Sequence, residues 1–206
     1  MGHPARLGRV TVASQPRDSR PWRRRLTPAP DPFYAAGVAK YSLHMPELET
    51  PRFVDGKPML IAGIGKRYNR NEMVTAMTGI PLQWQRFLPE MAKVPGRVGG
   101  VAYGVGYNGD NVGNFDYLCG VEVTDRPPPS SDFSCISLSA QRYAVFTHRG
   151  PLSTLRATWG AIYQWLPASG YKRARAPDFE RYGENFDARS NSSVVEIWIP
   201  VESAPA

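Results

Sequence analysis

The sequence lacks any long hydrophobic run. No stretch of about eighteen consecutive apolar residues occurs, so no segment is predicted to cross a membrane as a helix. The arginines near the N-terminus are followed by "LTPAPDPF" rather than by an apolar segment, so neither a secretory signal nor a twin-arginine signal is predicted. We therefore expect a cytoplasmic protein without a membrane partner.

Cysteine and histidine are also scarce. The two cysteines, Cys119 and Cys135, lie in apolar segments typical of strands. Buried free thiols are the favoured interpretation, and a disulfide or a reactive thiol is the alternative. The three histidines are far apart in the sequence, and with the cysteines they form no zinc-binding spacing. We therefore predict neither a metal site nor a cofactor.

Acidic residues are scarce at the N-terminal end. Residues 1–30 hold seven arginines, no lysine and one acid, Asp18, a net charge of +6, so residues 31–206 carry only +1 of the chain's +7. Five prolines and no hydrophobic periodicity predict that this basic tail is disordered. It could contact nucleic acid or anionic lipid, but an extension from a start site set too far upstream is the favoured interpretation. Residues 31–50 form an irregular lead-in, either a short helix or extended chain.

The ordered body is predicted to begin near Pro51. Residues 58–69 change from apolar to polar and are typical of a strand. Apolar residues at spacings of three and four predict helix over residues 71–91, with Asn71 as N-cap and with a break so that Pro81 opens a second short helix. The other expected elements are strands 100–108 and 115–123 joined by a "GDNVG" turn, a proline-rich connector 124–132, strand 134–150, helix 151–167 and strands 178–186 and 193–201.

This order of elements repeats. "FLP" at residues 87–89 recurs as "WLP" at 165–167, and "YGVGYN" at 103–108 recurs loosely as "YGENFD" at 182–187. We therefore infer two copies of a strand–helix–strand–strand unit, each too small to bury a stable core alone. We predict an α+β fold of two fused units with pseudo-twofold symmetry, antiparallel sheets with helices on one face, and a ligand cleft where the halves meet. The predicted halves are residues 51–124 and 133–203.

The segments "RYAVFTHRGPLSTLRATWGAIYQWLPASGY", "FERYGENFD" and "VEIWIPV" resemble the GyrI-like small-molecule-binding domain, the effector-binding domain of AraC-type and multidrug-sensing regulators. In the first half, "PMLIAGIGKRYN", "WQRFLP" and "AYGVGYN" follow the same family pattern, so the resemblance covers Pro51 to Val201. It implies the two-unit fold and a central cleft that holds a glutamate, here Glu180. The regulators carry a helix-turn-helix before this domain. The first fifty residues show no such pattern, so the chain resembles the stand-alone branch, and no direct sequence-specific DNA binding is expected.

Strand alternation places Glu180 and Tyr182 on one face of their strand. In the last strand Val195, Ile197 and Ile199 suit helix packing, so we expect Trp198, on the other side, to face the cleft with Glu180 and Tyr182. An acid walled by aromatic rings can bind an organic cation, or it can act as a general base when burial raises its pKa. The alternative is an exposed glutamate paired with Arg181 or Lys172. Aligning the repeated tyrosines makes uncharged Val101 its counterpart, so the cleft would hold one carboxylate.

Other candidates have a structural alternative beside the functional one. Tyr143 could donate a proton or hydrogen bond into the cleft, or belong to the core. His148, on the same strand face as Phe146, could donate a proton or simply be a satisfied histidine at a strand end. Tyr103 and Tyr107 share one strand face as a ring platform for a flat ligand, or as core. The predicted ligand-binding residues are Glu180, Tyr182, Trp198, Tyr103, Tyr107 and Phe146, and Trp84 and Trp159 are assigned to core.

Three functions follow. The first is a module that binds a hydrophobic, aromatic or cationic small molecule as a sensor or sequestering factor. The second, implied by the resemblance to a subset of stand-alone members, is a hydrolase that opens cyclopropane-bearing genotoxic compounds, with Glu180 as general base and Tyr143, Tyr103 or His148 as proton donor. The third is a protein partner like the gyrase inhibitors that name the family. It ranks last because a DNA-mimicking inhibitor would be strongly acidic, and residues 31–206 are nearly neutral.

Overall fold

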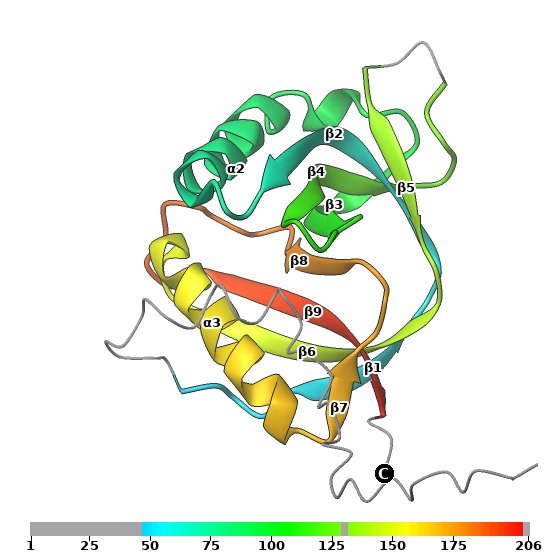
Figure 1. The fold of residues 1–206 in the computed structure, drawn as a ribbon. Coiled ribbons are helices and arrows are strands. Elements are labelled where there is room, and N and C mark those ends of the chain that lie inside the picture. The colour runs from blue at the N-terminus through cyan, green and yellow to red at the C-terminus, as the bar shows by residue number, and fades with distance from the viewer. Residues whose placement is uncertain (1–46, 129–131, 204–206) are drawn as a thin grey trace, which may run out of the picture.

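The computed structural model describes residues 47–128 and 132–203, without the side chains of residues 73–77. In these residues nine antiparallel strands form one sheet that curls into a half-barrel, with two α-helices on one of its faces (Figure 1). This is the predicted α+β class. The predicted basic tail and most of the lead-in lie outside the described residues.

The corresponding strands of the two units follow one another in the same order from either edge of the sheet, apart from β7. It runs β1-β6-β9-β8-β3-β4-β2-β5, with β7 paired to β9. The unit β2-α2-β3-β4 meets the unit β6-α3-β8-β9 where β3 pairs with β8. The strand before each unit joins the other unit, because β1 pairs with β6 and β5 pairs with β2. The strands are β1 (Arg52–Gly56), β2 (Met59–Asn69), β3 (Arg97–Tyr107), β4 (Asn114–Val123), β5 (Ser134–Leu138), β6 (Gln141–Arg149), β7 (Tyr171–Arg173), β8 (Asp178–Tyr182) and β9 (Val194–Ser203).

The first helix, α2 (Met73–Phe87), is continuous through Pro81, so the predicted break is wrong. The proline removes one backbone hydrogen bond, but Trp84 and Phe87 beyond it pack into a core cluster with β2 and β4, which favours a single helix. The second helix, α3 (Leu155–Trp165), lies within the predicted residues 151–167. Within residues 47–128 and 132–203, three short 3₁₀ turns complete the helical segments: η1 (Met91–Lys93), η2 (Leu152–Thr154) and η3 (Leu166–Ala168).

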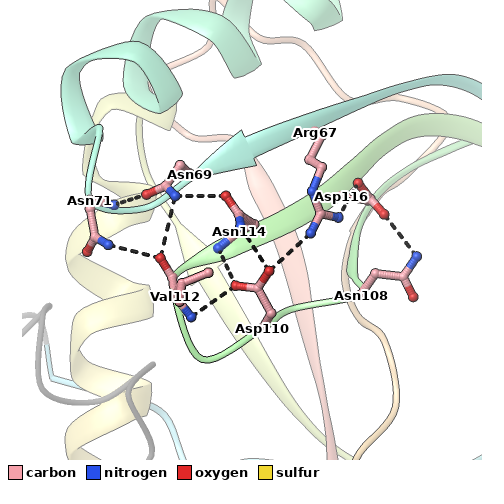
Figure 2. A network of polar contacts seen from close by, with 8 residues as sticks. All are labelled: Arg67, Asn69, Asn71, Asn108, Asp110, Val112, Asn114 and Asp116. Carbon is pink, nitrogen blue, oxygen red and sulfur yellow. Dashed lines mark hydrogen bonds and ion pairs between the residues drawn. The ribbon is translucent and has the colours of Figure 1, made fainter.

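The predicted cap Asn71 serves the β3–β4 turn instead of α2. Its backbone N–H donates to Asn69 Oδ1 at 2.8 Å and its side chain to the Val112 carbonyl at 3.0 Å. Figure 2 shows the network to which these bonds belong. Its centre is Asp110, whose carboxylate accepts from the side chain and the backbone of Asn114. These bonds lower the pKa of Asp110, and they fix the turn against the segment that leads into α2.

The two faces of the sheet bury different side chains. On the helix face, α2 covers β2 and β4, α3 covers β6 and β9, and a small central cluster of Ala102, Tyr182 and Val195 lies between them. In the described part of the chain, the inner face of the half-barrel has no helix packed on it, and its side chains pack against one another. Its buried residues are Ile61, Tyr103, Val105, Leu118, Leu138, Tyr143, Val145 and Phe179.

Two further sequence predictions can be compared with the structure. Both cysteines are free thiols, as favoured: Cys119 is buried and Cys135 is partly buried. No helix within the described ranges has the length and apolarity needed to cross a membrane.

Candidate functional site

The carboxylate of Glu180 lies at the centre of a buried hydrogen-bond network. Its side chain extends from β8 onto the helix face, and the residue is only 9% exposed. Trp159 Nε1 donates to Oε1 at 2.8 Å. The hydroxyls of Tyr182 and Tyr117 donate to Oε2 at 2.7 and 3.0 Å. Three neutral donors therefore satisfy this carboxylate.

Both helices reach this network. Trp159 belongs to α3, and Trp84 of α2 donates its Nε1 to the Tyr117 hydroxyl at 3.1 Å. The Trp84 ring also meets the Tyr182 ring edge to face, with centroids 4.9 Å apart. Glu180 is therefore the point where the two halves of the fold, each with its own helix, share one polar group.

Gly104 of β3 makes the space for this arrangement. It pairs directly with Glu180 across the two strands. A Cβ at this position would lie 2.1 Å from the Tyr117 hydroxyl oxygen and 2.9 Å from Glu180 Oε2. Because such contacts are far inside van der Waals distance, only glycine allows the tyrosine and the carboxylate to meet over the strand.

Burial raises the pKa of Glu180 above its ordinary value, while the hydrogen bonds from Trp159, Tyr182 and Tyr117 oppose that rise and the charge of Asp178 adds to it. Burial also raises the pKa of both tyrosines, and the charge of Glu180 contributes, so they stay neutral donors. The site can thus hold a negative charge that only neutral dipoles stabilise.

Asp178 is a second buried carboxylate on the same face of β8, and its charge is compensated differently. Asp178 pairs with Arg173 at 2.5 Å, so its charge has a cationic partner within the chain. Among the described residues no arginine or lysine forms an ion pair with Glu180. The partners considered in the sequence, Arg181 and Lys172, bind Glu196 and Glu202 instead. The alternative of an exposed, paired glutamate is therefore wrong.

Glu180 and Tyr182 share one face as expected, but the placement of Trp198 on that face is wrong. Glu180 pairs with Ile197, so it projects with the aliphatic residues of β9 toward the helices. Trp198 pairs with Phe179, and their rings stack on the inner face with centroids 5.1 Å apart. The residues of the last strand indicated a purely aliphatic helix face, but this face also carries the buried acid.

The remaining predicted site residues are not gathered around Glu180. Tyr143 and Tyr103 belong to the inner-face core, where both rings meet Phe179 edge to face, and partly buried Tyr107 packs against the same cluster. Phe146 is on the helix face, but its ring packs on Trp165 of α3 at 5.0 Å. Their roles in ligand binding or catalysis stay predictions.

His148 is buried under the start of α3. Its Nδ1 lies 2.8 Å from Thr158 Oγ1 and its Nε2 lies 3.3 Å from the Pro151 carbonyl oxygen. Burial lowers the pKa of the imidazole, and the backbone contacts at Pro151 and Gly150 partly offset this. This geometry matches the structural alternative for His148, a histidine at a strand end whose two ring nitrogens both have polar partners.

Three members of the network were absent from the predicted site. Trp84 and Trp159 were assigned to core because they continue apolar helix stripes, and the indole nitrogen of each carries the polar contact. Tyr117 was not considered. A signal was available for it: within the alternating strand 115–123 it is the residue that combines a ring with a hydroxyl. In the part of the chain described, no group of three or more histidine, cysteine or acidic side chains could hold a metal ion.

The amino-acid sequence is similar to those of known proteins. The model of a family described as the GyrI-like small molecule binding domain matches residues 49–202. The transcriptional regulator BrlR of Pseudomonas aeruginosa is 33% identical over 121 residues, 57% of this chain and 44% of BrlR. The probable transcriptional regulator YgiV of Escherichia coli (strain K12) is 39% identical over 66 residues, 32% of this chain and 41% of YgiV. The chain therefore spans less than half the length of these curated relatives.

Solved structures share the fold. SAV2435, determined bound to tetraphenylphosphonium, has a TM-score of 0.61 at 19% identity, covering 76% of this chain and 94% of its own. An integron cassette protein from the mobile metagenome of Vibrio cholerae has a TM-score of 0.58 at 23% identity, covering 75% and 97%. The C-terminal domain of EcmrR has a TM-score of 0.52 at 18% identity, covering 76% and 99%. At these identities the likeness establishes the fold.

Proposed function

Because the chain belongs to the family of GyrI-like small molecule binding domains, we propose that it binds an aromatic organic cation against Glu180, between α2 and α3. The observation that carries the proposal is the buried carboxylate of Glu180, which is held by three neutral donors and by no cation of the described residues. The binding unit would comprise both predicted halves, residues 51–124 and 133–203.

A ligand cation would supply the charge that the chain does not. A buried carboxylate without a cationic partner is costly, and Asp178 with Arg173 illustrates how this fold compensates one internally. A ligand near Glu180 would also contact the rings of Trp84, Trp159 and Tyr182. Each ring face adds about 0.5–2 kcal/mol of cation–π attraction. The pairing of SAV2435 with tetraphenylphosphonium, a bulky aromatic cation, supports the choice of ligand class.

Two probes of nearly equal shape and opposite charge test this proposal. Calorimetric titration of the protein with tetraphenylphosphonium should give binding, and titration with tetraphenylborate should give none. Glu180→Gln should weaken tetraphenylphosphonium binding by about tenfold or more, because two opposite charges about 6 Å apart attract by roughly 3 kcal/mol at the effective dielectric constant of a protein site. Glu196→Gln is the matched control: it removes the same charge one strand away, on the other face, and should bind like the wild type.

Three results would contradict the proposal. Equal binding of both probes would show that charge does not select the ligand. Undiminished tetraphenylphosphonium binding by Glu180→Gln would remove the carboxylate from recognition. A loss of binding in Glu196→Gln as large as in Glu180→Gln would point to the overall field of the protein instead of the site.

The hydrolase hypothesis finds less support in this geometry. It requires a proton donor beside the general base, and the expected donors Tyr143, Tyr103 and His148 lie in the inner-face core or are engaged by Thr158. The hydroxyls that do lie beside Glu180, those of Tyr117 and Tyr182, donate to the carboxylate itself, and burial raises the pKa of both, which makes them weaker acids. A role as a binding module, sensing or sequestering its ligand, therefore stays the favoured function.

A further inference from the structure

A cavity of about 360 Å³ opens at the rim of the sheet, apart from the Glu180 network. That volume lies at the lower end of the range for small-molecule sites. None of its lining residues belongs to α2, α3 or β8, which hold the Glu180 network together with β4. They come from the start of β2, the start of β3, the end of β4 and from β5: Pro58, Met59, Leu60, Val98, Glu122, Val123, Thr124 and Ser137.

A distortion of β3 lies beside this cavity. The register between β3 and β4 shifts between Arg97, which pairs with Val123, and Ala102, which pairs with Val121, so β3 carries extra residues that have no partner in β4. Gly99 within this bulge has a φ of +64°, a conformation that side chains rarely adopt. The Gly100 N–H donates to Glu184 Oε1 at 3.0 Å, which holds the bulge in place. Bulges of this kind commonly form beside binding sites.

The chemistry of the lining is specific. Glu122 is its single charged group, and within the described ranges it forms no ion pair. Its charge reaches the inner face, because together with the larger effect of burial it raises the pKa of Tyr103. Thr124 adds a hydroxyl two residues after the acid, whereas Ser137 pairs with Leu60 on the helix face and Glu122 pairs with Ile61 on the inner face. The rest of the lining is aliphatic, without an aromatic ring, and includes Val98, which is 43% exposed.

We propose that this rim cavity is a second binding site, which takes a protonated aliphatic amine. The ammonium group would pair with Glu122 and donate another proton to the Thr124 hydroxyl, which is an acceptor as well as a donor. The alkyl chain would lie along Met59 and Val98. The absence of rings from the lining separates this ligand class from an aromatic cation at Glu180.

Methyl groups of methionine report on the two sites separately. Met59 lines the rim cavity, whereas Met91 packs beside Trp84 on the helix face. In the full chain with ¹³C-labelled methionine methyls, hexylamine at neutral pH should shift the Met59 signal saturably and leave Met91 unchanged. Hexanol and hexanoate share the alkyl chain but lack the positive charge. Titrations that follow the Met59 signal should give them dissociation constants at least about tenfold higher than that of hexylamine.

Two variants test the assignment to Glu122. Glu122→Gln should raise the hexylamine dissociation constant by about tenfold, through the loss of one charge-assisted pair. Val98→Phe, at a partly exposed position, should weaken the binding by filling the cavity while the melting temperature stays close to that of the wild type. Glu180→Gln should bind hexylamine like the wild type, so this result does not depend on the proposed function.

Three outcomes would overturn the proposal. The first is a Met59 signal that hexylamine does not shift. The second is equal binding of hexylamine and hexanol, which would show that the cavity binds alkyl chains without recognising the charge. The third is a Glu122→Gln variant that keeps wild-type affinity in a protein that unfolds like the wild type.

Discussion

Glu180→Gln should change how the stability of the protein depends on pH. The substitution keeps the shape of the side chain. The glutamine carbonyl oxygen can accept from Trp159 Nε1 and its amide can donate to the Tyr117 and Tyr182 oxygens, but the two hydroxyl protons then lose the acceptor that the carboxylate gave them. That loss does not depend on pH, so the change with pH in the difference of unfolding free energy between variant and wild type reports on the charge.

The sign follows from the direction of the pKa shift. Burial raises the pKa of Glu180 above its ordinary value of 4.5. Between the unfolded and the folded pKa the native state binds more protons than the unfolded chain, so wild-type stability falls as the pH rises through this interval. One such group contributes a slope of at most about 1.4 kcal/mol per pH unit. Glu180→Gln lacks this slope and should gain on the wild type as the pH rises.

Urea unfolding at pH values from about 4 to 8 measures this difference, with equal m-values confirming that the unfolded states are comparable. Other titrating groups largely cancel when the two proteins are subtracted. The unfolding free energy of the variant minus that of the wild type should be lowest near pH 4 and should increase toward neutral pH. Glu196→Gln should keep the slope that Glu180 causes.

Two results would refute this reasoning. A flat difference would mean that Glu180 titrates alike in the folded and unfolded chain. A wild type that gains on the variant as the pH rises would mean that the three hydrogen bonds outweigh burial and lower the pKa. Either result would also weaken the case that the carboxylate lacks a cationic partner.

Two further predictions concern the frame around the site. Gly104→Ala should cost about 1–3 kcal/mol in urea unfolding, because its Cβ would lie 2.1 Å from the Tyr117 hydroxyl oxygen. Gly183→Ala, which would meet nothing within 4 Å, should stay close to the wild type, and equal losses in both would contradict the role of close contact. Thr158→Val should cost about 1–3 kcal/mol by leaving buried His148 Nδ1 without its partner at 2.8 Å, and an unchanged melting temperature would show that a water replaces the hydroxyl.

The longer elements could be predicted because they carry clear periodicity. β2, β3, β4 and α3 lie close to their expected ranges. β1 and β7 were missed because three to five residues carry little pattern. The expected strand 134–150 is two strands, since β5 pairs with β2 while β6 pairs with β1 and β9. Which neighbour a strand selects depends on the whole sheet, and its own residues do not encode it.

The site was harder to predict because a shift of one residue reverses the face of a strand. Aligning Tyr103 with Tyr182 made Val101 the counterpart of Glu180, yet Val101 packs on the inner face and Glu180 projects toward the helices. The offset of 78 between "FLP" and "WLP" gives Ala102 instead, which lies on the helix face. The counterpart is still uncharged, so the expectation of one carboxylate at this position is unaffected.

The exchange of β1 and β5 between the two units bears on how the chain folds. Each outer strand completes the sheet of the other unit, so neither unit reaches its full set of strand partners while the other is unformed. The pairing of β1 with β6 also closes one of the longest loops in the chain, which favours slow folding. We therefore expect the two units to unfold together in one cooperative transition, and a chain cut in the connector at residues 124–132 to regain its structure only when both fragments are mixed.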